Sequence, residues 1–134
     1  MTRTDELHAL LVRVKAATRG DRDLEAELFA TLGCTTIYRT NYADWYCRWP
    51  NDQGEYRLMP APMSCVDHAL ALIARLLPDW GGRVSFGSTS TARLWHGERA
   101  DKIQAQDGAS PALALIAALL SALISKEGTH AEHL

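Results

Sequence analysis

The apolar positions at the start of the chain recur at helical spacing and predict two short, consecutive helices. Thr4 can cap the first helix, which Gly20 ends, and Asp21 can cap the second, which ends at Gly33. Because the helices are short and follow each other directly, we expect a helical hairpin. Its apolar stripes are Leu7, Leu10, Leu11 and Val14 in the first helix and Leu24, Leu28, Phe29 and Leu32 in the second.

The next segment predicts a β-hairpin after an irregular stretch. Residues 34–43 show no regular pattern. The aromatic-rich segment 44–50 and the segment 55–59 are typical of strands, and residues 51–54 between them carry a turn signal. Prolines follow directly, and they end the second strand because proline has no amide hydrogen to donate to a neighbouring strand.

A third helix is predicted over 64–77. Ser64 and Asp67 have the spacing of a capping box, with aspartate in place of glutamate, and Pro78 with the glycine pair 81–82 ends the helix. Capping is therefore the role we assign to Asp67, in preference to general-base chemistry.

The last helix is predicted to begin at Ser110, a capping residue, and at Pro111, which suits the first helical position. Over 111–124 this helix has almost no polar face, so it is buried on most sides. Its cover is either the rest of the domain or a second subunit, which would make the chain a homo-oligomer. The polar residues 126–134 are predicted to form a flexible tail.

The predicted element order is helix, helix, two strands, helix, two or three strands, helix. Neighbouring hairpins imply a largely antiparallel sheet with helices packed on it, an α+β fold of the α/β/α sandwich type. The length of 134 residues fits a single domain over 1–134.

Two segments, 62–80 and 110–123, resemble segments of small phage and prophage proteins grouped as the phage ABA sandwich domain. In that group a helix starts near an Asp-Ala pair and ends near a tryptophan, and an apolar helix capped by Ser/Thr-Pro closes the domain. The matching residues here are Asp67, Ala69, Trp80, Ser110 and Pro111. The resemblance covers about 60–125, rests on helix signatures and not on a catalytic motif, and implies only this fold and a phage origin.

Composition narrows the function classes. The net charge is -2, and a protein that binds nucleic acid non-specifically needs a strong basic surplus. Three cysteines without a close pair, and a start that lacks a signal peptide, predict free thiols in the cytoplasm of a bacterial host. The longest apolar stretch is too short to span a membrane, so we expect no membrane partner.

The first candidate binding surface lies on the predicted strands 83–87 and 91–96, with a third short strand expected near 101–105. Alternation places Val84, Phe86, Ala92 and Leu94 on one face and Arg83, Ser85, Thr91, Arg93 and Trp95 on the other. Arginine can grip a phosphate and tryptophan can stack on a base. The alternative is a half-solvated sheet face on which arginine stems cover the tryptophan.

The second candidate surface lies in the aromatic-rich region. In a strand over 44–50, Trp45, Cys47 and Trp49 would point to one side, and Asp44, Tyr46 and Arg48 to the other. One set is core, and the other is expected to line a ligand groove or a protein interface, where tryptophan, tyrosine and arginine are enriched. We select Tyr46 and Arg48 as candidate ligand-binding residues.

Catalytic and metal sites find little support. The chain carries none of the common phosphate-loop, dinucleotide, metalloprotease or nucleophile-elbow motifs. Cys34, Cys47, Cys65 and His68 could meet around zinc, but structural zinc sites usually show paired cysteine spacing. We therefore expect no metal, no cofactor and no catalytic residue.

The sequence thus favours a phage-type, non-enzymatic binding module. One hypothesis is a sponge that sequesters a small anionic, nucleotide-like immune signal through Arg83, Ser85, Arg93 and Trp95, with Tyr46 and Arg48. The alternative is a protein-interaction module that inhibits a host protein or serves as a phage accessory factor. A small hydrolase that uses Cys47, Cys65 or His68 ranks third, because no nucleophile with an evident base is visible.

Overall fold

A computed structural model describes residues 2–52, 54–97 and 103–132 of the chain. The α+β class and the element order are confirmed, with one added strand early in the chain. In order, the elements are α1 (Arg3–Ala16), α2 (Arg22–Thr31), β1 (Thr35–Arg39), β2 (Asp44–Arg48), β3 (Arg57–Leu58), α3 (Val66–Leu76), β4 (Trp80–Ser85), β5 (Ser90–His96), β6 (Gln104–Gly108) and α4 (Pro111–Glu132).

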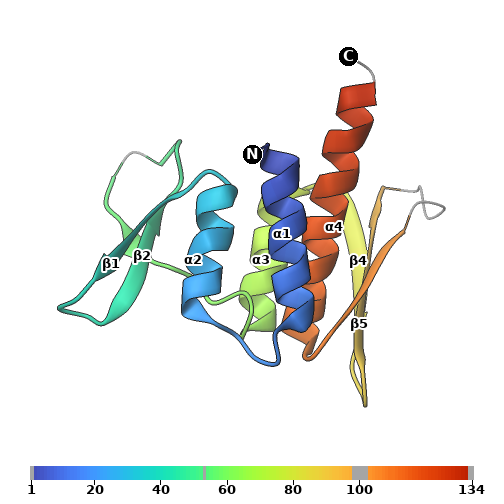
Figure 1. The fold of residues 1–134 in the computed structure, drawn as a ribbon, viewed down its shortest axis with the longest axis horizontal. Coiled ribbons are helices and arrows are strands. Elements are labelled where there is room, and N and C mark those ends of the chain that lie inside the picture. The colour runs from blue at the N-terminus through green and yellow to red at the C-terminus, as the bar shows by residue number, and fades with distance from the viewer. Residues whose placement is uncertain (1, 53, 98–102, 133–134) are drawn as a thin grey trace.

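The strands form two antiparallel sheets instead of one. Sheet A has the order β1-β2-β3 and sheet B the order β4-β5-β6. Figure 1 shows sheet A on one side of the helices and sheet B on the other. Helices therefore cover only the inward face of sheet B, where a sandwich of the expected type would place helices on both faces of a sheet.

Helix α4 lies at the centre of the core. Its residues from 112 to 120 are all buried, and it packs against α1, α3 and strands β5 and β6. The expected oligomer interface through 111–124 is therefore wrong, because side chains of the same chain already cover this segment. The helix also continues to Glu132, through most of the predicted tail; residues 133–134 lie outside the described part.

Membrane insertion finds no support in the helices. Within the described ranges, no helix combines the length and the apolar character that crossing a bilayer requires.

Side-chain caps fix where several helices begin. Asp21 accepts hydrogen bonds from the amides of Asp23 (2.9 Å) and Leu24 (3.2 Å), and Ser110 accepts one from the amide of Leu113 (3.2 Å), as predicted.

Two other predicted caps are wrong. Helix α1 begins two residues earlier than expected, because Thr2 and Asp5 form a capping box in place of Thr4. Helix α3 begins after Cys65 without a side-chain cap, so Ser64 and Asp67 do not form the expected box.

Several strand boundaries differ from those that the local sequence pattern predicts. Residues 35–39, expected to be irregular, pair with β2 as strand β1. The glycines Gly81 and Gly82 lie inside β4, although they were predicted to be a helix stop. Phe86, predicted to share a strand face with Val84, follows the end of β4 and is 80% exposed. The third strand of sheet B begins at Gln104; residues 101 and 102 of its expected range lie outside the described part.

The close approach of β6 to α4 gives a stability prediction. A Cβ atom added to Gly108 would lie 2.5 Å from the amide nitrogen of Ala114, which is backbone and cannot rotate away. We expect Gly108→Ala to lower the free energy of unfolding by about 1–3 kcal/mol in urea titrations. Gly87→Ala is the matched control, because nothing lies within 4 Å of the added atom. Equal stability of the two variants would contradict this packing.

Candidate functional site

Sheet B presents a polar outer face with the alternation that the sequence predicts. Arg83 lies opposite Arg93, Ser85 opposite Thr91, and Gly81 opposite Trp95. The intervening residues Ala92 and Leu94 are buried beneath the sheet, 0% and 2% exposed, on the side of α4. The structure therefore brings four of the six candidate binding residues, Arg83, Ser85, Arg93 and Trp95, onto one surface, which we call the outer face of sheet B.

Two positive charges meet on this outer face without a carboxylate between them. Both Arg83 and Arg93 are exposed, and among the described residues neither forms an ion pair. The nearest acid in the register, Asp107, accepts a hydrogen bond from Thr91 at 2.6 Å instead. Like charges directly opposite each other in a sheet are destabilising. An anion bound between the two arginines would relieve this repulsion.

Trp95 is only partly available to a ligand. It is half-buried, and a Cβ atom added to Gly81 would lie 3.3 Å from its indole Nε1. The indole thus covers the space that the glycine leaves on the same face. This packing supports the alternative role for Trp95 as a structural cover, with its remaining surface beside the two arginines.

The other two candidates, Tyr46 and Arg48, lie in sheet A and do not join this surface. The guanidinium of Arg39 lies 4.6 Å from the centre of the Tyr46 ring, and that of Arg48 lies 4.8 Å from the centre of the Tyr56 ring. Each arginine therefore already has an aromatic partner within the chain. The six residues predicted as one ligand set belong to two separate sheets (Figure 1).

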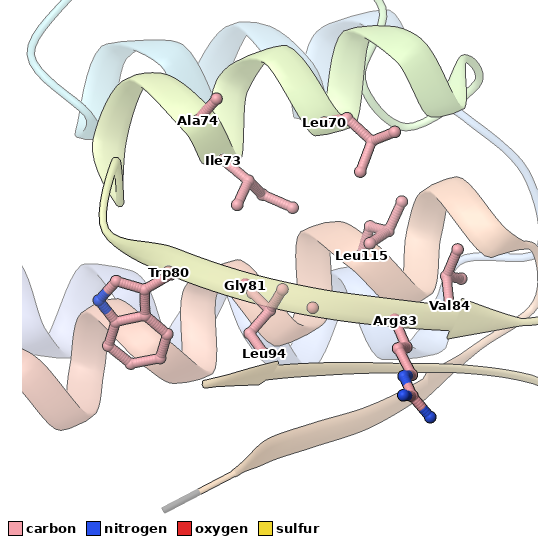
Figure 2. A pocket seen from close by; sticks show the side chains of 10 residues that line it. Leu70, Ile73, Ala74, Trp80, Gly81, Arg83, Val84, Leu94 and Leu115 are labelled. Atoms are coloured by element: carbon pink, nitrogen blue, oxygen red, sulfur yellow. The ribbon is translucent and has the colours of Figure 1, made fainter. Parts of the chain in front are cut away.

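A cavity lies beside sheet B, between β4 and α3. It has a volume of ≈ 230 Å³, and Figure 2 shows Leu70, Ile73 and Ala74 of α3 above the strand, with Leu115 of α4 behind. Arg83 points away from the cavity, whereas Val84 points toward it. The lining is almost entirely apolar, and Leu70 is 48% exposed, so the cavity opens to solvent as a groove.

A second cavity, of ≈ 270 Å³, lies between α2, α3 and the end of β2. Arg75 covers the Trp49 ring at 4.1 Å, and Trp49 packs edge-on against Phe29. His68 also lines this cavity, and its Nδ1 accepts a hydrogen bond from the amide of Ala61 at 2.9 Å. Arg75, Trp49 and His68 thus already have partners within the chain, which fits a structural role for this cavity.

The three cysteines lie in two separate places in the part of the chain that the structure describes. Cys34 and Cys47 are buried side by side, and the hydrogen bond between their thiols raises the pKa of Cys34. Cys65 and His68 lie on another segment. Nowhere in 2–52, 54–97 or 103–132 do three or more histidine, cysteine or acidic side chains gather in a way that could hold a metal ion.

The buried carboxylate of Glu25 belongs to a network around Arg22. Glu25 is fully buried, pairs with Arg22 at 3.0 Å and accepts a hydrogen bond from the amide of Met63 at 2.9 Å. Arg22 also pairs with Asp44 at 3.0 Å and donates to the carbonyl of Met59 at 2.7 Å. The network joins α2 to sheet A and to the segment before α3, so its role is structural.

The pKa values of the two carboxylates in this network shift in opposite directions. Desolvation raises the pKa of Glu25 above its ordinary value of 4.5, against the opposing effects of its hydrogen bonds. A hydrogen bond from the Trp45 amide, with Arg22 nearby, lowers the pKa of Asp44. Displaced pKa values often mark active sites, but here each carboxylate has partners within the chain.

Comparison with known proteins adds no relative. No family model matches the chain, and neither the curated proteins nor the solved structures give a significant match. The fold and the site are therefore interpreted from their own geometry.

Sequence reasoning missed the groove between α3 and β4 as a site. Leu70 and Ile73 lie within the predicted helix 64–77, and Gly81 and Gly82 are predicted to end that helix. A glycine pair inside a strand often marks a place where another backbone approaches closely, and this was the available signal.

The opposed arginines predict a stability gain on charge reversal. We expect Arg93→Glu to raise the free energy of unfolding by about 0.5 kcal/mol at low salt, because it turns a repulsive cross-strand pair into an attractive one. Urea titration measures this, with Arg57→Glu on β3 as a control for the change in net charge. A loss of stability specific to Arg93→Glu would show that the pair is structural.

The buried carboxylate gives a pH prediction. Because the pKa of Glu25 is raised in the folded chain, folding favours the protonated carboxyl group. The contribution of this group to the free energy of unfolding is complete below pH 4.5 and is lost as the pH rises through the folded-state pKa. The stability of the wild type relative to Glu25→Gln should therefore fall as the pH rises from 4 to 7. Asp44 is present in both proteins, so the difference between them reports Glu25 together with its coupling to Asp44 through Arg22. A difference that stays constant or grows with pH would contradict this.

Proposed function

We propose that this chain is a non-enzymatic interaction module that binds an acidic partner through the outer face of sheet B. The observation that carries the proposal is the register of Arg83 opposite Arg93 on an exposed face, with no carboxylate partner for either among the described residues. An acidic side chain placed between the two guanidinium groups would relieve their repulsion and form charge-assisted hydrogen bonds.

The shape of the surface favours a protein partner over an enclosed small molecule. Arg83, Ser85, Thr91 and Arg93 lie on an open sheet, and neither of the two cavities described above is lined by Arg93 or Trp95. Small ligands usually bind in concave sites that bury most of their surface. Arginine and tryptophan on an open surface are typical of the residues that dominate protein interfaces.

A nucleotide-like ligand is the second candidate function. Arg83 and Arg93 could contact a phosphate together, and the exposed part of the Trp95 indole lies on the same face for a base to stack on. A phage origin, a role against host defence and a cytoplasmic location remain predictions from the sequence, and neither candidate function depends on them.

The test is an NMR titration of the ¹⁵N-labelled chain with a short polyglutamate peptide and, separately, with a panel of cyclic and linear nucleotides. We expect the peptide to shift the amide signals of Arg83, Ser85, Thr91 and Arg93, with an affinity that falls as salt is added. The double variant Arg83→Glu/Arg93→Glu should weaken binding at least about tenfold, because it reverses both charges.

The control is Arg57→Glu, which changes an exposed arginine of sheet A and should leave the titration unchanged. Saturable binding of a nucleotide, with a shift of the Trp95 indole signal and without a response to the peptide, would favour the second candidate. Shifts confined to other elements, or shifts that survive the double reversal, would overturn both.

A further inference from the structure

Strand β4 forms a free edge of sheet B. Among the described strands it pairs with β5 alone, and Figure 2 shows α3 on the side of β4 that faces away from β5. The amide of Gly97 donates to the carbonyl of Asp79, which makes the 79–97 pair a hydrogen-bonded one in this register. Hydrogen-bonded pairs alternate along an antiparallel ladder, so the amides and carbonyls of Gly82 and Val84 point away from β5 toward the free edge.

The apolar groove runs along this same edge. Gly82 and Val84 line it from β4, and Ile73 and Ala74 line it from α3. The space that a Cβ atom would take at Gly82 is filled by Leu94, which also lines the groove. A strand added to β4 would therefore find backbone partners at the edge and an apolar floor beneath alternate side chains.

The charges on sheet B indicate which residue types an added strand would carry. In an added strand, residues that point into the groove alternate with residues that lie on the outer face, beside Arg83. Apolar side chains fit the first set, and acidic side chains fit the second. A second copy of β4 does not fit, because self-pairing would bring another Arg83 and Arg93 onto a face that already holds two unneutralised cations.

We infer that β4 receives an extended segment of a partner protein in which acidic and apolar residues alternate, as an additional strand in the groove between α3 and β4. The inference rests on the proposed function and adds that the acidic partner binds as an extended strand. Backbone hydrogen bonds to Gly82 and Val84 give affinity, and the apolar residue in the groove gives specificity.

The test is selection of random peptides, displayed on a surface, against the full-length chain. We expect enrichment of peptides with acidic and apolar residues in alternation. Ala74→Glu places a carboxylate in the groove and should reduce binding of the selected peptides about tenfold or more. Ala71→Glu is the matched control, because Ala71 is exposed on the same helix but lines the other cavity.

A second measurement does not depend on the folding of a variant. N-methylation of alternate amides in a selected peptide should abolish binding for the set that faces β4 and be tolerated for the other set. Strand addition is overturned if both sets are tolerated, or if Ala74→Glu and Ala71→Glu behave alike. If the peptides still require Arg83 and Arg93 in that case, the proposed function stands alone; if no acidic peptide is enriched, both proposals fail.

Discussion

Helix α4 carries apolar side chains in every direction between residues 112 and 120, and all of them are buried. Such a helix is stable in water only when other elements cover its whole circumference. Helices α1 and α3 and the inner face of sheet B supply this cover. Because sheet B is used on one side in this way, its other side needs no apolar residues, and this constraint makes its outer face available for binding.

The two faces of sheet B therefore differ in burial and in charge. Ala92 and Leu94 point inward and are closed off, whereas Arg83 and Arg93 point outward and repel each other. The arginines of sheet A differ in this respect, because Arg39 and Arg48 lie over tyrosine rings of the same chain. Among the described residues, Arg83 and Arg93 form no ion pair, and the proposed acidic partner would supply the missing negative charge.

Local signals in the sequence were sufficient for some features and not for others. The cap at Ser110 and the alternation on β5 depend on neighbouring residues, and both were predicted correctly. The division into two sheets and the Arg22 network depend on contacts between segments far apart, such as Arg22 with Asp44 and Met59. The groove was missed for the same reason, because α3 and β4 form it together and each alone is ordinary.

Hydrogen exchange of single amides, followed by NMR with and without a selected acidic peptide, tests the central claim most directly. In the free chain the amides of Gly82 and Val84 should exchange rapidly, while those of Gly81 and Arg83, which face β5, should be protected. The peptide should slow the exchange of Gly82 and Val84. Protection of these two amides in the free chain, or a peptide that protects other elements and leaves β4 unchanged, would contradict the account.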